Sequence, residues 1–259
     1  MSTLSFSGLY EPIPDIVAYL SRIGYCGDLE ANVETLAGLM RAHMRSVPFE
    51  NLEVFFDKRE PDLSTAALFD KIVTRRRGGY CFELNGLFSR LLSSLGFSVS
   101  LFAARVVKSE YLSPPSHEVL CVAVEGKRYF CDVGFGGPVP SSPIELIYDC
   151  ELRCNEGRVY CFEKRDCGTA LCIMRNGEFS DLLIFSEAPL DAVDFIPLNA
   201  FCAFSPLEPF IHKPMVWMRE EDGRISIDGD SFREGDAETK ITSREELYRL
   251  LRERFGMKI

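Results

Sequence analysis

Residues 77–85 read Arg-Gly-Gly-Tyr-Cys-Phe-Glu-Leu-Asn, and they join a pair of glycines to a cysteine at the start of a helical pattern. Apolar residues then recur with helical period as far as Gly96. Cys81 therefore falls in the first turn of a buried helix, where unpaired amides and the helix dipole favour an anion. A neighbouring imidazolium would lower the pKa of the thiol further. The stretch predicts a thiolate nucleophile, and a buried structural cysteine is the alternative.

The search for a base is short because the chain has only three histidines. His43 lies on the apolar side of an expected helix, which is typical of a packing histidine. His212 precedes Lys213 and Pro214 in an expected surface loop. His117 opens an apolar strand directly after a break at Pro114-Pro115, where its ring would face a cleft. His117 is the predicted base.

Strand register supplies a carboxylate for this base. If Glu125-Gly126 forms a two-residue hairpin turn, the register places Val119 opposite Asp132. His117 shares a face with Val119, so His117 and Asp132 become diagonal neighbours about 7 to 8 Å apart at the backbone. A three-residue turn would move Asp132 to the other face. The order cysteine, histidine, aspartate predicts an activated thiol with an oriented base.

Helical patterns surround this stretch, and β-rich runs follow it. Helices are expected over residues 15–22, from 33 to just before Pro48, over 65–75, and over 243–255 behind a capping box. Strands are expected over residues 97–107, 117–124 and 128–133. The order helices, strands, then a smaller mixed segment predicts an α+β fold with an antiparallel β region. The glycines at 134–137 lack the Walker lysine and the complete dinucleotide fingerprint, so they predict a turn.

The composition of the chain limits which partners and which cellular location we expect. The chain has 259 residues, is 46% hydrophobic and 26% charged, and 29 basic against 39 acidic residues give a net charge of −10. The electrostatic field of this negative charge repels nucleic acid and anionic lipid, so we expect neither as a partner. Ten cysteines are too few for a disulfide scaffold and favour free thiols in a reducing compartment. Without a basic, apolar leader or a long apolar run, the expected location is cytoplasmic.

The chain resembles the arylamine N-acetyltransferases. The resemblance rests on residues 77–85, 117–120 and 132–137, together with Tyr-Leu-Ser-Arg-Ile-Gly at 19–24 and Val-Pro-Phe-Glu-Asn-Leu at 47–52. It implies three domains arranged around a triad like that of papain-like cysteine proteases. They are a helical domain at 1–90 with the nucleophile, a β-barrel at 91–200 with the histidine and aspartate, and a small α/β lid at 201–259.

The resemblance also implies a reaction. Cys81, His117 and Asp132 would be catalytic, and Cys81 would take an acetyl group from acetyl-CoA. It would pass that group to an aromatic amine, hydrazine or N-hydroxyarylamine in a ping-pong reaction, an activity of xenobiotic metabolism. The backbone amide of Cys81 is one expected oxyanion donor, and the second donor is left open.

Contacts to both substrates follow from the same resemblance. Phe49, Phe135 and Phe204 would line the aromatic pocket, although Phe201 could take the place of Phe204. The backbone at Gly136 and Gly137 would approach the cofactor because it carries no side chains. Residues 198–206 depart from the pattern of the family, so the preferred substrate and acyl group are left open.

Two further groups are structural in this interpretation. By resemblance, Arg77 forms a buried ion pair with Glu50. A zinc site is the less favoured interpretation of a cysteine-rich segment, because only its first pair has the spacing of ligands, and no metal is expected. These cysteines are Cys150, Cys154, Cys161, Cys167 and Cys172.

Two alternatives to acetyl transfer stay open. A cysteine peptidase or amidase could use the same three residues, because a triad does not by itself select its acceptor. A non-catalytic homologue could instead keep only the cofactor or aryl-ligand site. Cleavage without coenzyme A would indicate the hydrolase, and ligand binding without turnover would indicate the binding protein.

Overall fold

The computed structural model describes residues 6–108, 113–154, 157–221 and 223–259. Its helices are α1 (Ile16–Ile23), α2 (Val33–Ser46), α3 (Leu52–Asp57), α4 (Thr65–Phe69), α5 (Cys81–Ser94), α6 (Phe195–Phe204) and α7 (Arg244–Glu253). Four short turns of 3-10 or π helix lie at Phe6–Leu9, Asp70–Thr74, Ala192–Asp194 and Pro209–Ile211. None of the helices within these described ranges is long and apolar enough to cross a membrane.

Local signals in the chain set the helix ends. Asp15 caps α1 by accepting from the Ala18 amide at 2.9 Å, and Gly24 ends that helix in the left-handed conformation with φ 67°. Helix α2 ends just before Pro48, as expected. The expected helix over 65–75 changes character at Asp70, where a π-helical turn replaces the α-helix. Within the described residues, this is the only helix expected from sequence that the structure splits into two elements.

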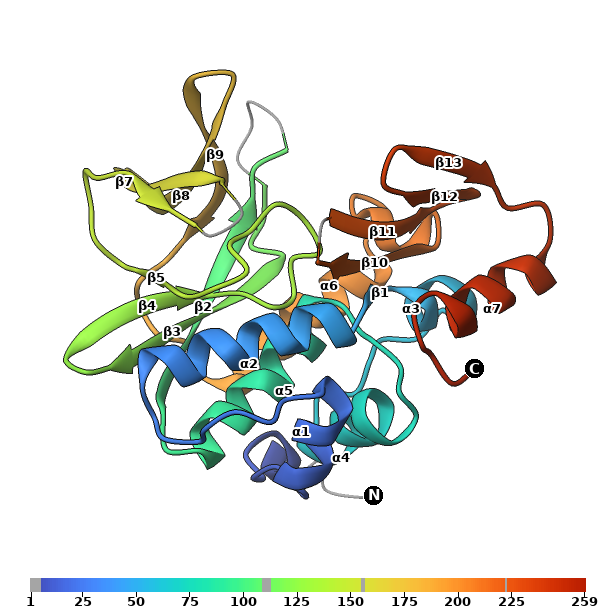
Figure 1. The fold of residues 1–259 in the computed structure, drawn as a ribbon, viewed down its shortest axis with the longest axis horizontal. Helices are drawn as coiled ribbons and strands as arrows, with labels where there is room; N and C mark the ends of the chain where they lie inside the picture. Colours follow the sequence, from blue (N-terminus) through green and yellow to red (C-terminus); the bar gives the residue numbers. More distant parts are fainter. Residues whose placement is uncertain (1–5, 109–112, 155–156, 222) are drawn as a thin grey trace.

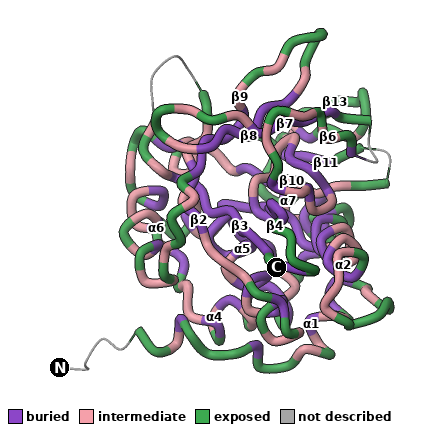
Figure 2. Tube along the Cα trace, turned by 90° about the vertical axis from the view of Figure 1, so that its left-hand side faces the viewer, coloured by how far each residue is buried: buried purple, intermediate pink, exposed green. Residues whose placement is uncertain are grey.

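The larger sheet has eight antiparallel strands in the order β5-β4-β3-β2-β9-β8-β7-β6 and forms a nearly closed barrel. Its strands are β2 (Ser98–Val106), β3 (His117–Val124), β4 (Lys127–Cys131), β5 (Ile144–Glu145), β6 (Leu152–Arg153), β7 (Val159–Arg165), β8 (Gly168–Arg175) and β9 (Glu178–Phe185). Helix α5 packs against β2 and β3, with α2 beside it (Figure 1). The buried residues gather where α5 meets these strands (Figure 2).

The hairpin between β3 and β4 has the register expected from sequence. Glu125 and Gly126 form its turn with φ values of 54° and 76°, as a type I′ turn requires. The ladder pairs Val124 with Lys127 and ends at Cys131, one residue before Asp132. The two-residue turn is therefore confirmed, and it fixes the face on which Asp132 lies.

The smaller sheet joins distant parts of the chain. Its order is β1-β10-β11-β12-β13, with strands β1 (Phe49–Glu50), β10 (Met215–Glu220), β11 (Gly223–Asp228), β12 (Ser231–Glu234) and β13 (Ala237–Lys240). Leu52 of α3 packs into the same core as the apolar side chains of α7, to the right in Figure 1. Two early elements thus lie with the C-terminal unit, and α6 spans residue 200. The division at residues 90 and 200 stays a prediction.

Candidate active site

Cys81 is the first residue of α5, and only 2% of it is exposed. The preceding loop must be made of glycine. A Cβ on Gly78 would overlap the carbonyl of Pro48, and one on Gly79 would lie 2.7 Å from Cβ of Glu83. The glycine pair therefore lets the chain pass between β1 and α5 and presents the cysteine at the start of the helix.

A buried network of charges holds this loop. Arg77 pairs with Glu50 at 2.7 Å, as the resemblance implied, and Lys71 bridges Glu83 at 2.6 Å and Glu53 at 2.7 Å. Burial raises the pKa of Glu83 to about 7 despite the charge of Lys71. Burial opposes the charge on Lys71, but the carboxylates around it outweigh that effect and raise its pKa. Sequence reasoning found the first pair and missed Lys71.

His117 and Asp132 meet as the register predicts. His117 Nε2 lies 2.7 Å from Asp132 Oδ2, and both side chains are buried. The other oxygen, Asp132 Oδ1, accepts from the Gly134 amide at 2.9 Å and from Asn85 Nδ2 at 3.0 Å. With both oxygens engaged, the carboxylate is fixed in position and leaves His117 Nδ1 as the ring nitrogen available to another group.

Asn85 connects the helix to the hairpin. Its Nδ2 also donates to the Glu118 carbonyl at 2.6 Å, and its Oδ1 accepts from the Val133 amide at 2.9 Å. It follows Cys81 by one helical turn, so both side chains lie on the same face of α5. Asn85 belongs to the motif at 77–85, but the sequence analysis assigned it no role. Its spacing of four residues from Cys81 could have indicated that both side chains lie on one face of the helix.

Cys81 and His117 line one cavity of about 240 Å³, which we call the cysteine cavity. Cys81 Sγ lies 3.7 Å from the carbonyl oxygen of Ser116, the residue directly before His117. A Cβ on Gly134 would lie 2.8 Å from Cα of Cys81, so the chain after β4 packs against the cysteine backbone. The structure thus brings the three predicted residues together at one site.

A second thiol lies beside the first. Cys202 of α6 donates to the same Ser116 carbonyl oxygen at 3.5 Å, and sequence reasoning did not foresee it. Burial raises the pKa of the Cys81 thiol, and Cys202 and nearby carboxylates act in the same direction. This effect opposes the helix N-terminus that was expected to lower the pKa. The thiol can therefore lose its proton readily only to a base within direct reach.

Aromatic rings form the wall of the cysteine cavity. Phe49 stacks on Trp217 with ring centroids 4.8 Å apart, and Phe135 meets the His117 ring edge-on at 5.3 Å. Phe210 completes this wall in place of Phe204. Phe204 lies at the end of α6, is 55% exposed and does not line the cavity, which corrects the expectation for this residue.

Phe201, the alternative to Phe204, packs against the main core and does not line the cysteine cavity either. Phe210 escaped sequence analysis because it lies in a short 3-10 turn without periodicity.

Gly136 and Gly137 border the cysteine cavity and also a larger cavity of about 490 Å³. Gly136 has a positive φ of 67°, and a Cβ there would overlap the Trp217 ring. A Cβ on Gly137 would overlap the ring of Phe135. The two cavities border each other at these glycines, and we call this boundary the passage.

The other two histidines stand apart from this site. His43 is buried, and its Nδ1 lies 2.9 Å from the Tyr19 hydroxyl. Burial lowers the pKa of His43 to about 3, so it stays neutral in the core. His212 is exposed and bonds through Nε2 to the Pro206 carbonyl at 2.9 Å.

One group in the cysteine-rich segment comes together. Cys161 and Cys172 are cross-strand partners on β7 and β8, and with Glu163 they place three potential metal-ligand atoms within 4.8 Å of one another. Arg165 pairs with Glu163 at 2.8 Å and with Asp181 at 2.7 Å, so cationic charge already neutralises these carboxylates. Cys150 and Cys154, the pair with ligand-like spacing, do not belong to this group.

Comparisons with known proteins agree on one family. A family model described as N-acetyltransferase matches residues 32–259. The arylamine N-acetyltransferase of Mycobacterium tuberculosis is 33% identical over 255 residues, covering 95% of this chain and 90% of that protein. The Escherichia coli enzyme is 31% identical over 252 residues, covering 94% and 89%.

Solved structures agree as well. An arylamine N-acetyltransferase from Salmonella typhimurium superposes with a TM-score of 0.90 at 29% identity, covering 96% of this chain and 93% of that one. The Mycobacterium marinum enzyme, solved in complex with CoA, superposes with a TM-score of 0.86 at 32% identity, covering 94% and 93%.

Proposed function

This chain belongs to the arylamine N-acetyltransferase family and is an acetyltransferase, and we propose that it carries the acetyl group as a thioester on Cys81. In this proposal acetyl-CoA is the donor, and an aromatic amine, hydrazine or N-hydroxyarylamine is the acceptor. The observation that carries it is the chain of hydrogen bonds from Asn85 through Asp132 to His117, which ends at the cavity of the cysteine. The CoA complex of the M. marinum relative supports the donor.

The first half-reaction loads the cysteine. Asp132 accepts a hydrogen bond from the Nε2 proton of His117, which leaves the lone pair of Nδ1 for the thiol proton of Cys81. The thiolate attacks the acetyl carbonyl carbon, and the bond between that carbon and the sulfur of coenzyme A breaks. The departing thiolate takes the proton from the imidazolium. Because burial disfavours an isolated thiolate at Cys81, the adjacent imidazolium is what stabilises it.

The second half-reaction unloads the cysteine onto the acceptor. The amine nitrogen attacks the thioester carbonyl, His117 takes a proton from that nitrogen, and the bond between carbon and Cys81 Sγ breaks. The released Cys81 thiolate then takes the proton back from the imidazolium, which restores the starting state. In both halves the backbone amide of Cys81, in the first turn of α5 where amides lack helical partners, donates to the oxyanion. The aromatic wall around Phe49 and Trp217 suits a flat aryl ring.

Mass spectrometry of the intact protein tests this proposal. Acetyl-CoA should add one acetyl group within the first turnover, and an arylamine should then remove it as the acetylated amine. Cys81→Ser should gain nothing. Cys202→Ser is the matched control, because its thiol shares an acceptor with Cys81, and it should still be acetylated. An adduct that forms on Cys202, or turnover of amides without coenzyme A, would contradict acetyl transfer through Cys81.

A further inference from the structure

The larger cavity of about 490 Å³ opens beside the cysteine cavity. The two cavities share the aromatic rings of Phe49 and Trp217, the glycines 136 and 137, and Arg224. A ligand that fills both must therefore cross the passage beside these two glycines. One end of that ligand would lie near the thiol of Cys81, and the other would lie in the larger space.

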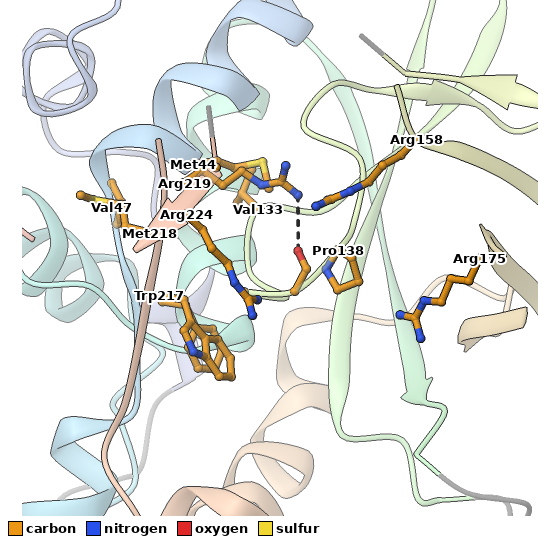
Figure 3. A pocket seen from close by; sticks show the side chains of 14 residues that line it. Met44, Val47, Val133, Pro138, Arg158, Arg175, Trp217, Met218, Arg219 and Arg224 are labelled. Carbon is orange, nitrogen blue, oxygen red and sulfur yellow. Dashed lines mark hydrogen bonds between the residues drawn. The ribbon is translucent and has the colours of Figure 1, made fainter. Parts of the chain in front are cut away.

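The charged side chains that line this second cavity are all arginines among the described residues, and we call it the arginine cavity. They are Arg158, Arg175, Arg219 and Arg224. Figure 3 shows the side chains of Arg158, directly before β7, and Arg175, at the end of β8, reaching toward those of Arg219 and Arg224, which come from β10 and β11. The described residues that line the cavity include no aspartate or glutamate. This concentration of positive charge contrasts with a chain whose net charge is −10.

Two of these arginines lie at directly opposed positions of one ladder. Arg219 and Arg224 are direct cross-strand partners in the β10 and β11 ladder. Like charges at directly opposed positions repel each other and destabilise a sheet. An anion bound beside this pair would interact favourably with both guanidinium groups and offset part of their mutual repulsion.

The backbone also holds one guanidinium in place. Arg219 donates to the carbonyl of Gly137 at 3.4 Å and to that of Val139, at the loop that borders both cavities. A guanidinium held in this way has already lost much of its rotational freedom, and its planar group matches phosphate oxygens in pairs. The arginine cavity therefore combines positive charge with a partly fixed geometry.

We propose that the arginine cavity binds the phosphate groups of the acyl donor, and this inference rests on the function proposed above. The arm that carries the thioester passes Gly136 and Gly137 into the cysteine cavity. Arg224 borders both cavities, so it contacts the diphosphate at the near end of the nucleotide. Arg175 lines only the arginine cavity and contacts the 3′-phosphate on the ribose. The four arginines thus select a phosphorylated donor over a short thioester.

Kinetics with three donors tests the proposal. The donors are acetyl-CoA, acetyl-dephospho-CoA without the 3′-phosphate, and the acetyl thioester of N-acetylcysteamine, which has no phosphate. The variants are Arg175→Gln, Arg224→Gln and the double variant. Arg233→Gln and Arg249→Gln, alone and together, are charge-matched controls because both side chains are more than half exposed and line neither cavity.

The expected result separates KM from kcat. Each substitution in the arginine cavity raises KM for acetyl-CoA about tenfold, in line with a lost charge-assisted hydrogen bond, and leaves kcat nearly unchanged. Arg224→Gln has the same effect with acetyl-dephospho-CoA, whereas the effect of Arg175→Gln disappears with that donor. Neither variant alters kcat/KM for the N-acetylcysteamine thioester. The controls leave KM for acetyl-CoA at the parent value.

Two results would overturn the inference. One is a double variant whose KM for acetyl-CoA matches that of the double control. The other is an equal loss with the donor that has no phosphate, because the substitutions would then act through the fold. Calorimetric titration of coenzyme A into Cys81→Ser, with and without the two arginine substitutions, checks binding without turnover. If no donor acetylates Cys81 but this binding depends on the arginines, the proposed function fails and the arginine cavity stands.

Discussion

The cysteine cavity and the arginine cavity share part of their walls but are built in opposite ways. The first rests on buried groups whose positions are fixed by hydrogen bonds, such as His117, Asp132 and Asn85. The second presents guanidinium groups from exposed or half-exposed positions on separate strands. Bond making requires a fixed geometry, whereas holding a flexible polyanion requires charge over a wider opening. Substitutions in the two cavities should therefore affect different kinetic constants.

The largest effect is expected from Asp132→Asn. The amide oxygen would face the Gly134 amide and Asn85, which donate on that side, so the amide NH2 would face His117 Nε2 and donate to it. His117 would then carry its proton on Nδ1 and present no lone pair to Cys81. By analogy with other triads, kcat falls about 10²- to 10⁴-fold. Binding of coenzyme A, measured by calorimetry, should not change. Glu118→Gln is the control: it replaces the buried carboxyl of the residue directly after His117 and should keep most of the activity.

A result in which Asp132→Asn weakened coenzyme A binding as much as turnover would break the separation of the two cavities. A loss of activity in Glu118→Gln equal to that in Asp132→Asn would contradict a specific role for Asp132.

The next effect concerns the proton of Cys81. Burial raises the pKa of this thiol, so in His117→Gln it stays protonated at pH 7. Alkylation by iodoacetamide should then be about 100-fold slower than in the parent protein at pH 7. Its rate should keep rising about tenfold per pH unit beyond about pH 8.5, where the rate of an ordinary thiol levels off. The parent protein, with His117 to take the proton, should react at neutral pH. A variant that reacted as fast as the parent at pH 7 would show that His117 is not the base.

A smaller effect is expected at the passage between the cavities. In Gly136→Ala the new methyl group meets the Trp217 ring, and the positive φ strains the backbone. We expect KM for acetyl-CoA to rise about tenfold, with a loss of stability that exceeds the roughly 1 kcal/mol of backbone strain, because the Trp217 ring must also shift. Gly24→Ala is the matched control because Gly24 has the same φ of 67° and open space around it. Gly24→Ala should lose only the roughly 1 kcal/mol of backbone strain and keep its KM, and a raised KM in both variants would refute a specific role of the passage.

The smallest effect is that of salt. Raising the ionic strength from about 0.05 to 0.5 M shortens the screening length several-fold and weakens attraction between exposed charges. KM for acetyl-CoA should therefore rise a few-fold, and KM for the N-acetylcysteamine thioester should stay constant. Stopped-flow or steady-state rates at constant pH are sufficient to measure this. An equal salt dependence of KM for the two donors would contradict the proposal that the arginine cavity attracts the donor electrostatically.

The sequence predicted those parts of the site that follow from local rules. Helix periodicity placed Cys81 at the start of α5, and counting from a two-residue turn placed Asp132 beside His117. Both rules operate within one element or between adjacent strands. The α+β fold with an antiparallel β region also followed from the order of helical and β-rich segments, whereas the barrel was implied by the resemblance to the family.

The remaining features depend on contacts between segments that are far apart in sequence. The arginine cavity draws its side chains from two different sheets, and isolated exposed arginines carry no periodic signal. Lys71 looked like an ordinary helix residue, yet it lies buried between two carboxylates. Phe210 replaced Phe204 because the chain after α6 turns irregularly, which no hydrophobic pattern announces.

The turn at Glu125 and Gly126 has a consequence for how the length of this chain can vary. Surface turns normally tolerate insertions and deletions, and this turn lies at the exposed tip of its hairpin. Here, however, inserting one residue would reverse the alternation of β4 and carry Asp132 away from His117 unless a bulge absorbed it. Insertion of two residues would restore the alternation. An insertion of one residue at this distant tip should therefore abolish most of the activity, whereas an insertion of two residues should preserve it.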